Sequence, residues 1–286
     1  MQVAGPSRRA GSVLAAGLLL LGAAAACRGT DGDNADGPGC RLPAVPSALA
    51  GGGDANALRV VEQGFSQVGP EPSEVSMGAV VENSGTQVAY RVRVAFQALD
   101  AHGGDAIAGG SRAFLVQEVP ILRPGERAAV GTSVSARSED PVGKPSVKAA
   151  KVSVAAAATG WLVPDDPEAP FADITTKVTA GQAARAEDGS TKIDYQVTSG
   201  YCGELVSRGV SMVFRDASGA IVGGFLANNP APTGCAVGTS IQQVSTADQS
   251  VPEKADLDRT EVTQYCDLSK ATAAPPGMAP SGTPVN

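Results

Sequence analysis

Hydrophobic and polar residues alternate in short runs from about residue 57 onward. The first clear run alternates Val75, Met77, Ala79 and Val81 with Ser76, Gly78, Val80 and Glu82. After the turn Asn83-Ser-Gly, a second run alternates Tyr90, Val92, Val94, Phe96 and Ala98 with Arg91, Arg93, Ala95, Gln97 and Leu99. A period of two is typical of a strand that buries one face, and two such runs joined by a turn predict a half-buried antiparallel hairpin.

Further strands are predicted before residue 163. Asp100-Ala-His-Gly-Gly-Asp predicts a turn, a strand follows through Phe114 to Val119, and Leu122-Arg-Pro-Gly-Glu126 predicts the next turn. Two later strands each place four small or β-branched residues on one face, namely Ala128, Val130, Thr132 and Val134, and then Ala150, Val152, Val154 and Ala156. No helix of convincing length is expected in this half of the chain.

The second half follows the same plan. Ile193, Tyr195 and Val197 alternate with Asp194, Gln196 and Thr198, and Val210, Met212 and Phe214 form the next alternating run. The segment Asp216-Ala-Ser-Gly-Ala-Ile-Val-Gly-Gly224 parallels Asp100-Ala-His-Gly-Gly-Asp-Ala-Ile-Ala-Gly-Gly110, which has two additional residues. We interpret this as an internal repeat. The simplest architecture is all-β, with two tandem immunoglobulin-like antiparallel β-sandwiches.

The N-terminus has the pattern of an export signal. Arg8 and Arg9 precede a short apolar run over 12–22, and the small residues 23–26 lead to Cys27. This order resembles a bacterial lipoprotein signal, in which the cysteine is lipidated and the peptide is cut before it, although Ala24 stands where leucine is usual. A membrane-spanning helix and a non-lipid signal peptide cleaved within 23–26 are the alternatives.

Charge limits the partners that this chain can have. Removal of residues 1–26 takes away two arginines and no acids, which leaves 20 basic against 29 acidic residues and a net charge near −9. Such a surface is a poor partner for nucleic acid or anionic lipid headgroups. The abundance of glycine and proline, 35 and 20 of 286 residues, favours short strands and turns over helices.

The five cysteines divide into Cys27 and four others. Cys40, Cys202, Cys235 and Cys266 are an even number in an exported protein, and we predict two disulfides. The preferred pairing is Cys202 with Cys266, on neighbouring strands, which leaves Cys235 for Cys40; Cys202 with Cys235 is the alternative. A zinc site is not expected, because no C-x-x-C motif is present and His102 is the only histidine.

The chain divides into segments of different composition. The predicted segments are a lipoprotein signal peptide (1–26), a lipidated flexible tether (27–56), a first β-sandwich (57–163), a hinge (164–170), a second β-sandwich with disulfides (171–270) and a disordered tail (271–286). The hinge holds Asp165, Asp166 and Glu168, which are either solvated carboxylates or calcium ligands between the domains.

The motif Phe96-Gln-Ala-Leu-Asp100, the hairpin before it and Leu122-Arg-Pro-Gly-Glu126 resemble FxLYD-type immunoglobulin-like domains of bacterial envelope proteins. Phe214-Arg-Asp216 is a shortened second copy. The exported region also resembles uncharacterised actinobacterial lipoproteins. The resemblance implies a fold and an envelope location, and it supplies no catalytic residues.

Few residues suggest chemistry. His102 is expected to be a solvated turn residue, the pairs Gly109-Gly110 and Gly223-Gly224 are expected at strand bulges, and Trp161 is expected to pack between the two domains. We therefore expect a non-enzymatic binding or structural lipoprotein without a cofactor or metal. It would be anchored through Cys27 to the extracytoplasmic face of the cell membrane and would contact an envelope protein or glycan. An enzyme or enzyme accessory with an unrecognised site is the alternative.

Overall fold

The structure is a computed structural model. It describes residues 54–69, 73–138, 146–163, 174–187, 190–200, 204–227, 235–246 and 250–271. All of these lie in one compact unit, Asp36–Asn286. Cys27, Cys40, Cys202 and the predicted hinge at 164–170 lie outside the described residues.

The described residues form β-strands and two short 3₁₀ helices, which confirms the predicted all-β class. The first six strands are β1 (Leu58–Val68), β2 (Glu74–Asn83), β3 (Val88–Leu99), β4 (Val116–Leu122), β5 (Arg127–Ser135) and β6 (Lys151–Leu162). The next six are β7 (Ile174–Arg185), β8 (Thr191–Ser199), β9 (Leu205–Arg215), β10 (Ile221–Ala227), β11 (Gly238–Ser245) and β12 (Asp256–Ala271). The helices are η1 (Ala55–Ala57) and η2 (Gly109–Leu115), and neither is long and apolar enough to span a membrane.

The strands form two antiparallel sandwiches. Strands β1 to β6 make the sheets β1-β2-β5 and β4-β3-β6, which enclose a core containing Met77 and Phe96. Strands β7 to β12 make the sheets β11-β8-β7 and β10-β9-β12, which enclose a core containing Tyr195 and Phe214. We refer to these as the first and second sandwich. The predicted inward-facing residues of β2, β3, β8 and β9 lie in these cores, except Tyr90, which lies in a separate cluster with Val88 and Leu162.

The predicted hairpin over the first two alternating runs is wrong. β2 pairs with β1 and β5, whereas β3 pairs with β4 and β6, so the turn after Asn83 carries the chain from one sheet to the other. Both strands contribute their apolar face to the same core. Periodicity indicates which face is buried, and it does not distinguish pairing beside a strand from packing across a sandwich.

The two sandwiches repeat one topology. β3 lies between β4 and β6 just as β9 lies between β10 and β12, and β2 and β8 are the central strands of the other two sheets. The turns that follow β3 and β9 also match. Asp100 Oδ1 accepts hydrogen bonds from the backbone N–H groups of His102 and Gly104 at 2.8 Å each. Asp216 Oδ1 accepts from Ser218 at 2.9 Å and from Ala220 at 3.1 Å. The backbone hydrogen bonds from Gly104 and His102 lower the pKa of Asp100, whereas the pKa of Asp216 is lowered mainly by a hydrogen bond from the Ser218 hydroxyl at 2.6 Å and further by the backbone N–H groups.

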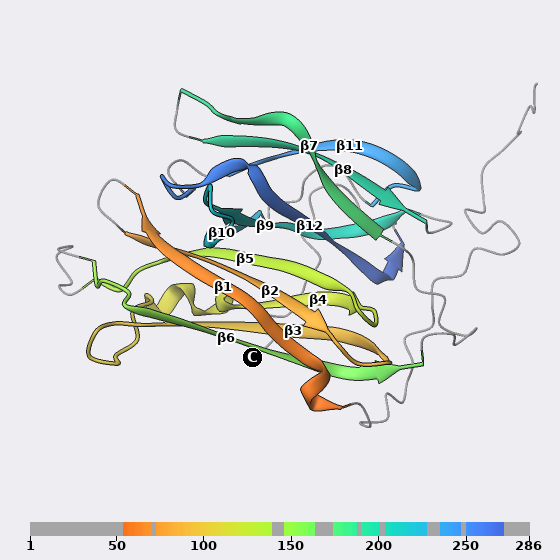
Figure 1. Ribbon diagram of the computed structural model, residues 1–286, viewed down its shortest axis with the longest axis horizontal. Helices are drawn as coiled ribbons and strands as arrows, with labels where there is room; N and C mark the ends of the chain where they lie inside the picture. The colour runs from red at the N-terminus through yellow and green to blue at the C-terminus, as the bar shows by residue number, and fades with distance from the viewer. Residues whose placement is uncertain are drawn as a thin grey trace, which may run out of the picture. The chain divides into compact units, whose positions relative to one another are not determined.

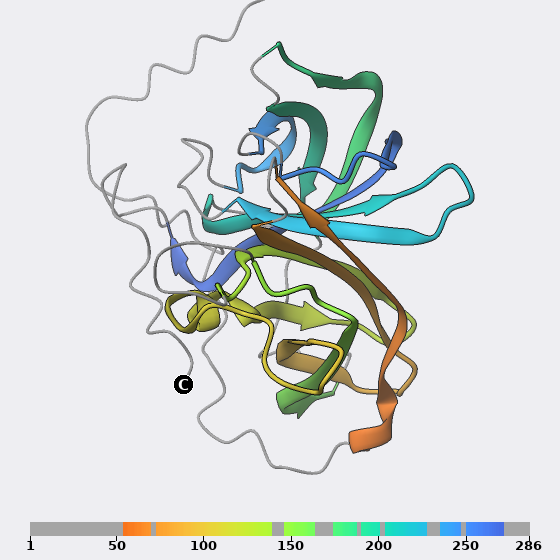
Figure 2. The same ribbon diagram turned by 90° about the vertical axis from the view of Figure 1, so that its left-hand side faces the viewer.

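The sandwiches pack against each other through unlike sheets, so that the four sheets form successive layers (Figures 1 and 2). The outer face of β1-β2-β5 meets the outer face of β10-β9-β12, and Val80, Ala129, Val213 and Ile221 form an apolar cluster between them. β2 is consequently buried on both faces, rather than half-buried as predicted.

Glycines let the backbones approach closely in this interface. A Cβ atom on Gly224 would lie 2.6 Å from Cα of Gly131, and a Cβ on Gly131 would overlap the carbonyl oxygen of Met212. Ser76 Oγ donates to the carbonyl of Gly224 at 2.8 Å and accepts from its N–H at 2.9 Å. Ser211 Oγ accepts from the N–H of Gly131 at 2.6 Å. The buried hydroxyls thus serve backbone groups that the sheets leave unpaired.

Ion pairs join the sandwiches at two places. Arg215 pairs with Glu62 of β1 and with Glu261, and Glu62 also pairs with Arg127. Elsewhere, Arg208 Nη1 lies 2.6 Å from Glu118 Oε1 of β4.

Glu118 also binds the Arg91 side chain, with 3.0 Å between Arg91 Nε and Glu118 Oε1. Arg91 has a positive φ of 49°, and the pairing of β3 omits Arg91 on both sides without a shift of register.

Three local predictions need correction. The strand expected from Phe114 begins at Val116, because Phe114 belongs to η2. Gly109-Gly110 opens η2 and is not a bulge, whereas Gly223 follows a register shift in β10, as expected. Trp161, near the end of β6, packs against the first core.

Candidate functional site

A disulfide lies at the start of the segment that leads into β11. Cys235 and Cys266 are bonded, with their Cα atoms 6.1 Å apart and both residues buried. The predicted pairing of Cys266 with Cys202 is therefore wrong, and so is the pairing of Cys235 with Cys40 or Cys202. Both bonded residues were predicted to form disulfides; the other two, Cys40 and Cys202, lie outside the described residues.

The backbone of Cys235 is also fixed in place, by two hydrogen bonds to Leu205. Its N–H donates to the carbonyl of Leu205 at 2.8 Å, and its carbonyl accepts from Leu205 N–H at 3.1 Å. The start of β9, Cys235 and the end of β12 thus lie together, as predicted for one end of the second sandwich. Strand adjacency alone did not select the partner: β12 pairs Cys266 with Ser207 of β9, after a register shift between Tyr265 and Cys266.

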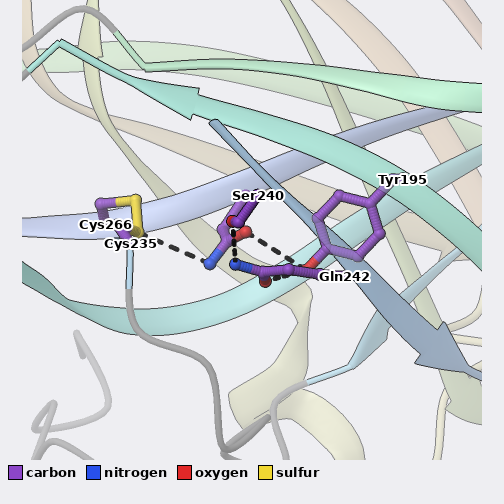
Figure 3. Close-up of a disulfide and its surroundings, with 6 residues drawn as sticks. Tyr195, Cys235, Ser240, Gln242 and Cys266 are labelled. Atoms are coloured by element: carbon purple, nitrogen blue, oxygen red, sulfur yellow. Dashed lines mark hydrogen bonds between the residues drawn. A yellow bond between two sulfur atoms is a disulfide. The ribbon is translucent and has the colours of Figure 1, made fainter. Parts of the chain in front are cut away.

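A row of polar side chains, buried except for the half-buried Ser240, extends from the disulfide along the inner face of β11 (Figure 3). Gln264 Nε2 lies 3.5 Å from Cys235 Sγ, and Gln264 Oε1 lies 3.2 Å from the hydroxyl of Tyr195. That hydroxyl donates at 2.8 Å to Gln242 Oε1, and Gln242 Nε2 reaches Ser240 Oγ at 3.2 Å. We call Cys235, Tyr195, Ser240, Gln242, Gln264 and Cys266 the β11 anchor.

Burial controls the acid–base behaviour of this anchor. Desolvation raises the pKa of Tyr195 to about 12, because the phenolate would have to form away from water. Burial also raises the pKa of Tyr265, and the nearby Ser211 hydroxyl partly opposes the rise. Tyr195 is therefore neutral at ordinary pH and acts in the anchor as a hydrogen-bond donor. The anchor is suited to holding β11 in place, and it offers no group poised to exchange a proton near neutral pH.

The opposite face of β11 points outward. Inward-facing Ser240, Gln242 and Val244 pair with Val197, Tyr195 and Ile193 of β8. The alternating residues Thr239, Ile241, Gln243 and Ser245 pair with the outward-facing Thr198, Gln196, Asp194 and Lys192. Two of these cross-strand pairs are hydrogen-bonded, Thr198 with Thr239 at 3.0 Å and Gln243 with Asp194 at 2.7 Å. The side chain of Ile241 is nevertheless 70% exposed, and Val237 just before the strand is 56% exposed.

β11 is also the edge strand of its sheet. In an antiparallel ladder, half of an edge strand's backbone N–H and C=O groups point away from its neighbour. The eight residues of β11 include no charged residue and no proline, and its pairing with β8 runs without a register shift. An ordered, uncharged edge with a projecting isoleucine can accept another extended chain, and we take this edge as the candidate binding site.

Alternation of apolar and polar residues could not identify this site. The two large apolar residues of Gly238–Ser245, Ile241 and Val244, are three positions apart and fall on opposite faces of a strand, so the exposed face could not be identified. The charge-free composition of the segment was the available signal.

His102 and the acidic residues were the other candidates for chemistry. His102 is exposed in the turn after β3, as predicted, and its N–H binds Asp100. In the part of the chain that the structure describes, no three His, Cys, Asp or Glu residues are grouped to hold a metal.

Comparisons with known proteins give little further guidance. No family model matches the chain, and no curated protein matches it. One similar solved structure is the exo-chitosanase CsxA of Amycolatopsis orientalis, at 9% identity and a TM-score of 0.18, covering 68% of this chain and 24% of that one. A second structure of the exo-β-D-glucosaminidase CsxA gives 10% identity, a TM-score of 0.17, and 77% and 26% coverage. This chain spans about a quarter of those proteins, and likeness at this level carries no argument about activity.

Proposed function

We propose that this chain is an exported lipoprotein, anchored through Cys27 to the extracytoplasmic face of the cell membrane, that acts as a non-enzymatic binding module. Its contact surface is the edge of β11, and its partner is a polypeptide in extended conformation. The open, uncharged edge of β11, held from behind by the β11 anchor, is the observation that carries this proposal. A polypeptide is favoured over a glycan because the edge presents backbone groups, which another backbone matches in spacing.

Two further features support the location. The disulfide between Cys235 and Cys266 is of the kind that persists outside the cytoplasm. The signal-like sequence that ends at Cys27 supplies both export and anchor. The resemblance to FxLYD-type envelope domains implies the same setting and remains a prediction.

The anchor is tested by replacing Cys27 with alanine. Wild-type protein should partition with membranes and carry an acyl mass at Cys27, and the Cys27→Ala protein should lose both. A variant that stays in the membrane fraction, together with a wild type lacking acyl mass, would overturn the lipoprotein assignment.

The binding surface is tested by cross-linking on intact cells. A photoreactive group attached to a Gln243→Cys variant, on the outer face of β11, should capture a polypeptide. The matched control is Ala157→Cys, which puts the same group on an exposed residue of β6 in the first sandwich. Equal capture by both variants, or none at Gln243, would show that β11 is not the contact surface.

A further inference from the structure

The first sandwich contains a counterpart of the β11 edge. β5 holds the same place beside β2 that β11 holds beside β8. At the C-terminal end of β5, the chain's own segment before η2 forms an antiparallel bridge, Ile107 with Ala136. Ala108 N–H donates to the carbonyl of Ser135 at 2.9 Å, and Arg137 N–H donates to the carbonyl of Ala106 at 2.7 Å. Thr132 Oγ1 also donates to the carbonyl of Phe114 in η2 at 3.1 Å. The fold therefore covers the end of this edge in its first copy.

The second copy lacks the segment that provides this cover. The connection from β3 to β4 runs from Asp100 to Leu115 and contains both the extended segment and η2. The corresponding connection from β9 to β10 is the short turn Asp216–Ala220. Among the described residues nothing replaces the missing segment along β11, and Ile241 stays 70% exposed.

The other edge strands carry features that discourage pairing with another chain. The pairings of β1, β7, β10 and β12 contain register shifts, β4 holds Pro120, and β6 begins with Lys151. Bulges, prolines and lysines are the usual protections of sheet edges. β11 has none of them.

The charge of the chain favours a second copy of the same chain as the partner of β11. The protein without residues 1–26 has 20 basic against 29 acidic residues and a net charge near −9, so two copies repel each other. β11 is a place where they can meet without bringing like charges together, because neither strand carries one. An antiparallel edge is also complementary to itself about a twofold axis.

We propose that β11 pairs antiparallel with β11 of a second copy of this chain, joining two three-stranded β11-β8-β7 sheets across a twofold axis. This inference rests on the proposed function, since it names the polypeptide that the β11 edge binds. The two Ile241 side chains would lie near the axis on the same outer face of the joined sheet, where they cover each other from water.

The oligomeric state of the full-length protein in detergent tests the pairing. Light scattering during size exclusion should give a dimer for the wild type and a monomer for Ile241→Lys, with at least a tenfold weaker dimer. In a dimer the two lysines would place like charges near the axis. The substitution should leave the fold intact, because Ile241 is exposed. Ala157→Lys adds the same charge to β6 and should remain dimeric. A monomeric wild type, or a dimeric Ile241→Lys protein, would overturn the pairing.

Hydrogen exchange of the wild type gives a second measurement that needs no variant. Amides of β11 should become more protected as protein concentration rises, whereas those of β6 should not change. Protection of β11 that is independent of concentration would assign the edge to another segment of the same chain and overturn the proposal. If the wild type is monomeric while Gln243→Cys captures a different polypeptide on cells, the second-copy assignment fails and the proposed function stands.

Discussion

At the scale of single residues, the smallest side chains determine how the two halves of the molecule meet. Gly131 and Gly224 come from strands of different sandwiches, and neither has room for a methyl group. Ser76 and Ser211 are fully buried beside them and bind backbone groups across the interface. Interiors are packed too densely to accommodate an added carbon by local adjustment when the obstacle is backbone.

We therefore expect Gly131→Ala to lower the free energy of unfolding by about 3 kcal/mol, since the new Cβ would push against the Met212 carbonyl. Gly109→Ala is the matched control, because a Cβ at that position meets nothing within 4 Å. The control should change the free energy by less than about 0.5 kcal/mol in urea unfolding. Equal values for the two variants would mean that the interface is not close-packed at Gly131.

The sequence predicted inward-facing residues well and missed the second buried face. Tyr195 and Met77 were placed by alternation, and both lie in sandwich cores. Ser76 and Gly78 alternate with core residues and were expected to face water. They are covered by a layer that begins more than a hundred residues later, and local periodicity carries no information about such a layer. The lack of charge at Ser76, Gly78 and Val80 was the available indication.

At the scale of elements, the disulfide connects the segment just before β11 to β12. It closes a loop with a sequence separation of 31 residues. We expect the Cys235→Ala, Cys266→Ala double variant to lose about 4 kcal/mol of unfolding free energy on the loop-entropy description. Amides of β11 should then exchange faster than those of β3, because the strand loses its fixed starting point. Unchanged stability and unchanged exchange in β11 would show that the anchor does not depend on the disulfide.

Strand order predicted where the cysteines lie, but it did not predict which of them are bonded. Strand order brought the start of β9, Cys235 and Cys266 to one end of the second sandwich, which the structure supports for Leu205, Cys235 and Cys266. The choice of partner required the register as well as the strand order, and β12 pairs Cys266 with Ser207 of β9 after a register shift.

At the scale of the whole molecule, the repeated topology is stacked head to tail. The first sandwich uses its β1-β2-β5 sheet for the interface, and the second uses β10-β9-β12, which corresponds to β4-β3-β6 of the first. Unlike surfaces therefore meet, as in a heterologous contact. The outer faces of the remaining sheets carry larger polar residues, such as Arg93 and Gln97 on β3 and Gln196 on β8.

The ion pairs across this interface make its stability depend on pH. The hydrogen bond from Arg215 is the main cause that lowers the pKa of Glu62 from its ordinary value of 4.5. A lowered folded-state pKa stabilises the fold above the unfolded-state value and ceases to do so as pH falls through the folded-state value. The difference in unfolding free energy between wild type and Glu62→Gln should be largest near neutral pH and shrink below pH 4.5.

Glu253→Gln is the control for that measurement, because Glu253 is exposed and has no ion pair with any described residue. Its difference from wild type should stay small at every pH. A Glu62→Gln difference that grows toward acid pH would contradict the assigned role of Arg215.

The continuous packing between the layers predicts that the two sandwiches unfold together. Trp161, the single tryptophan, packs on the first core, so its fluorescence reports the first sandwich. Hydrogen exchange of peptides from β8 reports the unfolding of the second sandwich. Both probes should give the same urea midpoint in the wild type, since separating the sandwiches would expose the cluster around Val80 and Val213 and leave Ser76 and Ser211 without their backbone partners.

Gly131→Ala should separate the two midpoints, because it weakens the contact between sandwiches while leaving both cores intact. Gly109→Ala should keep them coincident. Two separate transitions already present in the wild type would show that the buried interface adds too little free energy to couple the halves. In that case β11 would be carried by a domain that moves independently of the first sandwich, and the rigid presentation of its edge would be lost.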